Sequence, residues 1–190
     1  VANNDPESIE SAKPLLKTPE VVMEVARYLS GDTMAPLADL ILAVARNESQ
    51  SQAVRVAALR KIHWSQIDEE SQKERDRLIV SLLDKETVPL HERLELLWNL
   101  QEAPPAATLK QLLKEVTEQS VEISGYQISS FIKFAKNDPE VIENVKALLK
   151  TPEQVLEAAK YLDEDKIAPL VPLILAVARD GSEARAVRVA

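Results

Sequence analysis

The chain has 190 residues, of which 45% are hydrophobic and only 4% aromatic, with three glycines and no cysteine. So few glycines exclude collagen, low-complexity sequence and a hairpin-rich β-sandwich, while the lack of cysteine excludes disulfides, thiolate zinc sites and thiol catalysis. The 31 acidic and 23 basic residues give a net charge of −8, which argues against a nucleic-acid partner held by a basic face. Since no apolar run reaches about 18 residues, we expect no transmembrane segment.

Helix-start signals recur along the chain at short intervals. Asp5-Pro6-Glu7 and Thr18-Pro19-Glu20 each combine an N-cap residue, a proline at the first helical position and an acid in the first turn. Gly31-Asp32 breaks the second of these helices. Apolar residues at a spacing of three and four then predict six more helices, over 35–46, 51–63, 68–83, 88–100, 104–116 and 120–136.

The chain contains a long internal repeat. Residues 1–57 align without a gap on residues 134–190, at an offset of 133, and 36 of these 57 positions are identical. The longest shared run, LILAVAR, occupies 40–46 and 173–179. We therefore expect one eight-helix unit over 1–133 and the first four helices of a second copy over 134–190, in one continuous solenoid. Since both ends fall inside the repeat, we interpret the chain as a fragment of a tandem array.

These patterns predict an all-α fold. Eight helices in 133 residues give about 33 residues per helical pair, and short links make neighbouring helices antiparallel. A strongly apolar helix (37–45) alternates with a charge-striped one (70–85), which indicates two layers. The sequence therefore predicts an α-α superhelix, a solenoid like those of HEAT and armadillo repeats, with about twelve antiparallel helices.

Two stretches resemble a known family. The first is AVRVAALRKI at 53–62, and the second runs from 83 to 139 and ends in VEISGYQISSFIKFAKNDP. Their order and spacing, over roughly 90 residues, resemble the α-helical superhelix of the large lipid transfer protein superfamily of vitellogenins, apolipophorins and apolipoprotein B. In that family the superhelix occurs once and lipid-cradling β-sheets follow it. Here Asp138-Pro139 leads into another helical copy, so the resemblance covers the superhelix region only.

One group of residues suggests a ligand-binding face. Ile123, Tyr126, Phe131 and Phe134 approximate one side of the eighth helix. They can form core against the adjacent repeat, or an apolar wall to which lipid or a partner binds. Separately, Asn47-Glu48-Ser49 fits the N-glycosylation pattern in a surface loop, although its counterpart at 180–182 lacks the asparagine and the match can be coincidence.

Signals for catalysis are missing from the sequence. The two histidines, His63 and His91, lack metal-ligand spacing, and no phosphate-binding glycine loop or nucleophile elbow is present. We therefore expect no catalytic, cofactor or metal site, and a protein that is not an enzyme. Arg55 lies in an otherwise apolar helix, where we expect it to pair with a carboxylate of the next layer.

Two functions remain open from the sequence. The first is a secreted, non-enzymatic lipid-carrier or yolk/storage-type segment, whose apolar surface removes acyl chains from water at about 25 cal/mol per Å². The alternative is a structural or protein-interaction array, a stiff rod or scaffold without a small ligand. The family resemblance favours the first and the near-identity of the copies favours the second. In either case we expect contacts with neighbouring repeats or self-association through residues 1–30 and 167–190.

Overall fold

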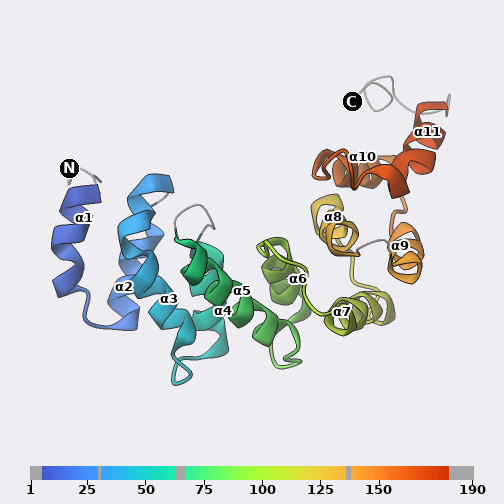
Figure 1. Cartoon of the computed structure of the whole chain (residues 1–190). Coiled ribbons are helices and arrows are strands. Elements are labelled where there is room, and N and C mark those ends of the chain that lie inside the picture. Colours follow the sequence, from blue (N-terminus) through green and yellow to red (C-terminus); the bar gives the residue numbers. More distant parts are fainter. Residues whose placement is uncertain (1–5, 30, 63–66, 136–137, 180–190) are drawn as a thin grey trace. The chain divides into compact units, whose positions relative to one another are not determined.

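The computed structural model describes residues 6–29, 31–62, 67–135 and 138–179, and it confirms the prediction of an all-α protein (Figure 1). The described residues form α-helices joined by short loops and 3-10 turns. By its internal contacts the chain falls into two compact units, 1–101 and 102–190.

Unit 1 contains six α-helices: α1 (Pro6–Ala12), α2 (Pro19–Arg27), α3 (Ala38–Arg46), α4 (Gln52–Lys61), α5 (Glu69–Leu83) and α6 (Leu90–Trp98). In the middle of the unit, α3 packs against α2, α4 and α5, and α4 packs against α3, α5 and α6. Each of these two helices therefore contacts both of its chain neighbours and the second helix after it.

Unit 2 contains α7 (Ala106–Glu118), α8 (Gly125–Phe134), α9 (Pro139–Lys146), α10 (Pro152–Lys160) and α11 (Val171–Arg179). Here α8 packs against α7, α9 and α10, while α7 also packs against α9 and α10 against α11. The same relation between helices thus recurs in unit 2. The contact of α8 with α10 is the most extensive of these.

The helix starts follow the capping residues of the sequence. Thr18 accepts a hydrogen bond at its side-chain oxygen from the Val21 amide (3.4 Å), and Thr151 accepts one from the Gln154 amide (3.3 Å). Asp138 does the same at α9, from the Glu140 amide at 3.0 Å. These bonds satisfy amides that have no partner inside the helix, so each helix begins at its Pro-Glu pair.

Two predicted helix starts were wrong. The second helix ends before Gly31, as predicted, but the third begins at Ala38 rather than at 35, because a 3-10 segment, Gly31–Leu37, which contains Pro36, precedes it. The eighth helix begins at Gly125 rather than at Ser120, because Ser120 adopts a left-handed backbone conformation (φ 51°) that ends α7. Residues 121–124 then form a link without regular secondary structure before α8 starts.

Two helices of the second copy keep the bounds of their counterparts in the first. The limits of α10 and α11 are those of α2 and α3 shifted by 133 residues, which is the offset of the sequence repeat. The boundary between the two compact units lies at 101/102, between α6 and α7 and inside the first copy. It therefore does not coincide with the repeat boundary at 133/134. The close superposition of the two copies stays a prediction.

Burial differs between the copies of the shared LILAVAR helix. In α3, Ile41 and Val44 are buried in the core and Leu40 is half-buried. In α11, Ile174 is only half-buried and Leu175 is 46% exposed. The difference arises because α3 packs between α2, α4 and α5, whereas the described neighbours of α11 are α10 and the 3-10 turn Ala168–Leu170.

Candidate binding grooves and the aromatic face

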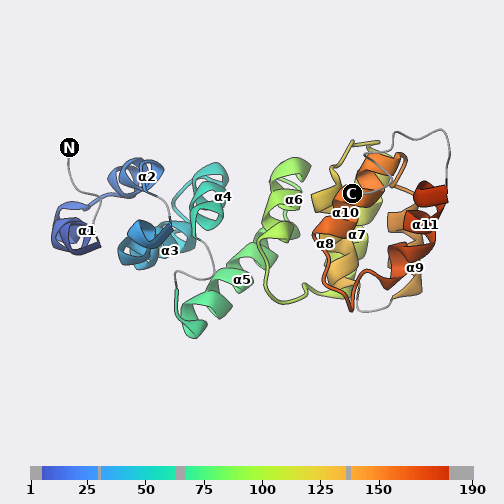
Figure 2. The same ribbon diagram turned by 90° about the horizontal axis from the view of Figure 1, so that it is seen from above.

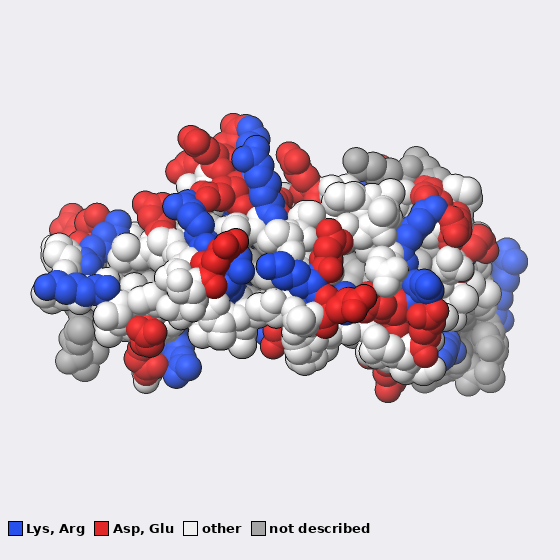
Figure 3. Space-filling view, turned by 90° about the horizontal axis from the view of Figure 1, so that it is seen from below, with Lys and Arg blue, Asp and Glu red and all other residues white. Residues whose placement is uncertain are grey.

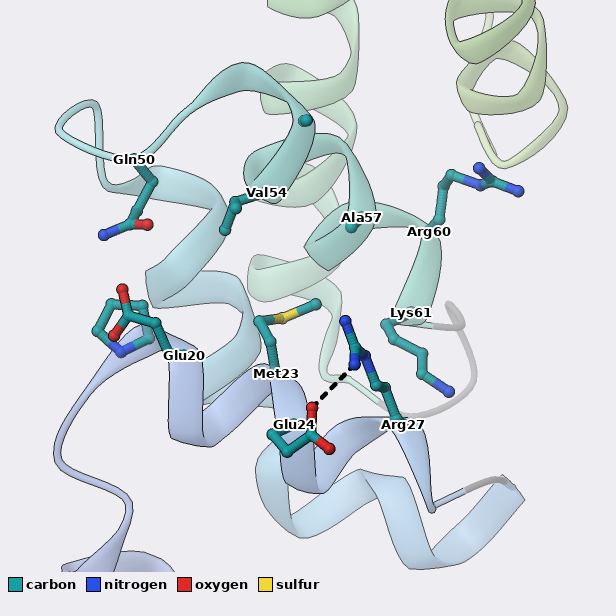
Figure 4. Close-up of a pocket in the computed structure, with 11 residues that line it drawn as sticks. Glu20, Met23, Glu24, Arg27, Gln50, Val54, Ala57, Arg60 and Lys61 are labelled. Atoms are coloured by element: carbon teal, nitrogen blue, oxygen red, sulfur yellow. Dashed lines mark hydrogen bonds and ion pairs between the residues drawn. The ribbon is translucent and has the colours of Figure 1, made fainter.

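Helices α2 and α4 are neighbours in the ribbon of unit 1 (Figure 2), and a groove between them is drawn with its side chains in Figure 4. We call it the α2–α4 groove. It has a volume of ≈ 690 Å³. Its lining residues come from α2, from α4 and from the loop before α4: Pro19, Glu20, Met23, Glu24, Arg27, Gln50, Ala53, Val54, Ala57, Arg60 and Lys61.

Small side chains on α4 keep this groove open. Ala53 and Ala57 are one turn apart, and both are exposed because their methyl groups are too short to reach α2. Met23 projects from α2 toward α4, between Val54 and Ala57 (Figure 4). The floor of the groove is therefore apolar and is formed in part by the AVRVAALRKI stretch.

Charged side chains line the edge of the α2–α4 groove. On α2, Arg27 donates to the Glu24 carboxylate at 2.9 Å, an exposed pair that adds little to stability. On α4, Lys61 donates to the Leu29 carbonyl at 3.5 Å, just after the end of α2. Arg60 lies 3.8 Å from Glu95 of α6. The three cations at this end of the groove thus lie beside acceptors of the protein itself, which are Glu24 for Arg27, the Leu29 carbonyl for Lys61 and Glu95 for Arg60.

Unit 2 has a smaller groove at the start of α7, which we call the α7–α9 groove. It has a volume of ≈ 390 Å³ and is lined by Ala103, Pro104, Pro105, Ala106, Leu109, Phe134, Ala135, Asp138 and Val141. Beside it, Lys110 of α7 forms ion pairs with Asp138 (3.1 Å) and Glu140. The hydrogen bond from Lys110 holds the pKa of the Asp138 carboxyl below its ordinary value, and the hydrogen bond to Glu140 raises the pKa of Lys110.

The structure places most of the predicted aromatic face inside unit 2. Ile123, Phe131 and Phe134 are buried, and Phe134 also lines the α7–α9 groove. Tyr126 is half-buried and meets Tyr161 of α10 edge-on, with ring centroids 6.3 Å apart. These four residues serve as packing between α8 and its neighbours, which is the core interpretation of the pattern. A role for them in contacting lipid stays a prediction.

The predicted glycosylation residue lies in a loop. Asn47 follows α3 and is half-buried, and its side-chain oxygen accepts a hydrogen bond from the Ser49 amide at 3.0 Å. Glu48 and Ser49 are exposed. The position suits a modified loop, and the modification itself stays a prediction. Of the two histidines, His91 is exposed on α6 and His63 falls outside the described residues.

Three buried arginines were only partly anticipated. Arg55 donates from Nε to the Ala45 carbonyl (2.8 Å) at the end of α3, and not to a carboxylate as expected. Arg93 donates to the Leu83 carbonyl (3.3 Å) at the end of α5, and Arg75 donates to the Asn99 carbonyl (2.9 Å) after α6. Each guanidinium thus satisfies a carbonyl that has no partner within its helix. The signal for Arg55 was an arginine inside an otherwise apolar helix, whereas Arg75 and Arg93 lie in helices with other charged residues and were not singled out.

The face shown in Figure 3 is mixed in charge, since Lys and Arg side chains lie among those of Asp and Glu. Across the described ranges, no group of three His, Asp or Glu side chains is placed to hold a metal ion. In the same part of the chain, no helix has the length and apolar character needed to span a membrane.

Comparisons of this chain with protein-family models, with curated proteins and with solved structures gave no match.

Proposed function

We propose that this chain is a non-enzymatic helical repeat module, a HEAT- or armadillo-like solenoid that binds other protein surfaces through its stacked helices. The observation that carries the proposal is the contact pattern within each unit. There, α3 and α8 each pack on both chain neighbours and on the second helix after them. In a solenoid every element contacts only elements close to it in sequence, because the layers stack along one direction.

The sequence repeat supports the same proposal. Helices α10 and α11 reproduce the bounds of α2 and α3, so the unit that repeats is a set of helices and not a single motif. Two antiparallel layers would follow if the helices alternate in direction along the array. In such an array each copy presents the same faces to its neighbours, which accounts for 36 identities in 57 aligned positions.

Small-angle X-ray scattering of the chain tests this proposal. A compact globule of 190 residues has a radius of gyration of about 16 Å. A solenoid has a clearly larger one, with a distance distribution skewed toward long vectors. A measured value near that of the globule would overturn the proposal.

Lipid carriage is a second candidate, and the α2–α4 groove favours it. Its ≈ 690 Å³ lies within the usual range of small-molecule sites, of about 300–1,000 Å³. An apolar floor of Met23, Val54 and Ala57 suits an acyl chain, while Arg60 and Lys61 at one end suit its carboxylate or phosphate. The groove is also lined by the stretch that resembles the large lipid transfer proteins. The chain would then be a secreted carrier or storage segment.

A lipid measurement separates the two candidates. For a lipid carrier, organic-solvent extraction of the purified chain should release lipid in a fixed molar ratio. Ala57→Trp should abolish that lipid by filling the α2–α4 groove, whereas Ala147→Trp, at an exposed position of unit 2, should not. An extract without lipid, together with no binding of a fluorescent fatty acid to the purified chain, would exclude lipid carriage.

A further inference from the structure

We propose that the exposed face of α2 is a docking surface for a helix of the α8 type, supplied by a preceding copy of the same repeat. The face, called here the α2 face, consists of Val21, Glu24, Val25 and Tyr28, which lie one turn apart along α2. The proposal rests on the repeat array proposed above and adds to it which surfaces join successive copies.

The second copy shows such a helix in place. On α10, the counterparts of Val21, Glu24 and Tyr28 are Gln154, Glu157 and Tyr161. Gln154 donates from Nε2 to the Ile123 carbonyl at 3.3 Å, and Glu157 accepts a hydrogen bond from the Gly125 amide at 2.7 Å. The Tyr161 ring packs edge-on against Tyr126. The start of α8 is thus held by side chains along one face of α10.

Close approach of these helices depends on Gly125. A Cβ atom at this position would lie 2.6 Å from the Glu157 Cβ and 2.7 Å from the Ala158 amide nitrogen. These distances are well inside van der Waals contact, so any side chain larger than hydrogen would push α8 away from α10. The sequence Ser124-Gly125-Tyr126 therefore identifies the kind of helix that this face accepts.

The α2 face keeps two of the four side chains of the α10 face, and in the described part of unit 1 no α8-type helix packs against it. Glu24 and Tyr28 are identical to Glu157 and Tyr161, and the two changes, Val21 for Gln154 and Val25 for Ala158, make the α2 face more apolar. Tyr28 is 75% exposed against 43% for Tyr161, and Val21 is 42% exposed. Glu24 accepts hydrogen bonds from Arg27 (2.9 Å) and Tyr28 (3.4 Å) of its own helix.

A neighbouring residue shows the same contrast. Leu15, just before α2, is 74% exposed, whereas its counterpart Leu148 is half-buried. Three large apolar side chains at 15, 21 and 28 are therefore in water in the first copy. Single exposed apolar residues need no explanation, but a group that is less exposed at every equivalent position of the other copy does.

The occupant follows from how α8 is already used. Within the chain α8 is engaged by α10, so a second molecule would have to break that contact before offering its α8 to α2. The α8-type helix of a preceding copy in the same array would have no such contact to break, because the α2 face would itself be the α10-type face that follows it. In sequence, Ala2, Asn4 and Asp5 repeat residues 135, 137 and 138, which join α8 to α9, so the same short link would connect an α8-type helix to α1.

The test uses the absence of cysteine from the chain. Val21→Cys places a single thiol on the α2 face, and its rate of reaction with a soluble disulfide reagent is measured in two proteins. One is the 190-residue chain, and the other carries a copy of residues 102–133 joined directly before Val1. If the added helix docks, the thiol should react at least about tenfold more slowly in the longer protein, because it is reachable only when that helix opens.

Three matched variants complete the experiment. Glu70→Cys, on the exposed face of α5, should react at one rate in both proteins. Gln154→Cys should react more quickly when Gly125→Leu is introduced, which establishes that the assay detects loss of α8 from a covered face. The change equivalent to Gly125→Leu in the added copy should restore fast reaction of Val21→Cys.

An unchanged Val21→Cys rate in the longer protein would overturn the proposal, whether or not circular dichroism shows that the added residues are helical. The solenoid proposal would survive that result, since it is tested separately by the radius of gyration. Conversely, slow reaction of the thiol in a protein that scatters as a compact globule would overturn the solenoid and keep the docking surface.

Discussion

Buried arginines do much to join the ends of helices in unit 1. The side chain of Arg75 is fully buried and lies 3.1 Å from Asp76, whose second carboxylate oxygen accepts a hydrogen bond from the Gln101 amide at 3.1 Å. Burial lowers the pKa of Arg75, and the Asp76 charge opposes that shift. The pair thus connects α5 to the residues after α6. Burying these two charges costs free energy, which is offset only while the ion pair and its hydrogen bonds to the Asn99 carbonyl and the Gln101 amide are all present.

Removing one partner of this pair should be strongly destabilising. Asp76→Ala leaves the Arg75 charge uncompensated in the core, and we expect a loss of about 3–5 kcal/mol in the free energy of unfolding, measured by urea denaturation. The double variant Arg75→Met/Asp76→Leu should lose less than Asp76→Ala alone. Lys73→Met, which breaks an exposed pair with Glu69 on the same helix, should cost less than about 1 kcal/mol. Equal losses for Asp76→Ala and Lys73→Met would contradict this account.

Lys110 should set the acid response of the junction between α7 and α9. Its hydrogen bond lowers the pKa of Asp138 below the ordinary 3.8, so the folded carboxyl binds its proton less readily than the unfolded one. The stabilisation is therefore complete above pH 3.8 and is lost as the pH falls through the lowered pKa. In Lys110→Met we expect the pKa of Asp138, followed by NMR titration, to rise. Lys114→Met, which removes the partner of Glu118 one turn later, should leave the pKa of Asp138 unchanged.

At the scale of elements, one helix sequence has two environments. The run LILAVAR forms α3 and α11 with matching bounds, so local sequence determines the helix. Burial is determined by what packs against it, since α3 is enclosed by three helices and α11 has an exposed leucine. The contribution of the same side chain to stability should therefore depend on its copy.

A matched pair of substitutions measures this dependence. Ile41→Ala removes a fully buried side chain from α3, and we expect a loss of about 2–5 kcal/mol from lost burial and the cavity left behind. Ile174→Ala makes the same chemical change on α11, where the side chain is half-buried, and should cost clearly less. Denaturant unfolding of both variants is the measurement. Equal losses would mean that α11 is covered in solution.

The sequence was sufficient to predict the elements and insufficient to predict their partners. Thr18, Asp138 and Thr151 marked helix starts correctly, because capping bonds are local. The left-handed Ser120 was missed, since serine is common in many backbone conformations. The α2–α4 groove was also missed, because it depends on where Ala53 and Ala57 fall relative to Met23, which is a long-range relation. The prediction that Arg55 pairs with a carboxylate was wrong for the same reason, since its partner, the Ala45 carbonyl, is set by how α3 and α4 pack.

At the scale of the whole molecule, two surfaces retain apolar side chains in water. Leu15, Val21 and Tyr28 are exposed in the first copy, and Val171 and Leu175 are exposed on α11 in the second. The equivalents of the first set are less exposed, with Leu148 and Gln154 half-buried and Tyr161 43% exposed, and the equivalent of Leu175, which is Leu42, is buried in the core of unit 1. Both surfaces therefore correspond to positions that are more enclosed in the other copy.

We expect these surfaces to drive concentration-dependent self-association through residues 1–30 and 167–190. Two different faces that pair between molecules form a heterologous contact, which produces a series of oligomers and not a closed dimer. The net charge of −8 opposes association, so raising the salt concentration should strengthen it by screening that repulsion. Analytical ultracentrifugation over about a hundredfold range of concentration, at low and high salt, measures both effects.

Single added charges identify which residues are responsible. Leu175→Lys places a lysine on the exposed face of α11. It should shift the chain toward the monomer, because any contact made there would remove the lysine charge from water at a cost in free energy. Ser49→Lys adds the same charge to the loop after α3, at a position outside both surfaces. It should shift the chain slightly toward the oligomers, because the only effect of the added lysine is a smaller net negative charge and so a weaker repulsion between molecules. The two variants thus move the equilibrium in opposite directions only if the face of α11 takes part. A chain that stays monomeric throughout, at both salt concentrations, would show that these side chains do not form a contact between molecules.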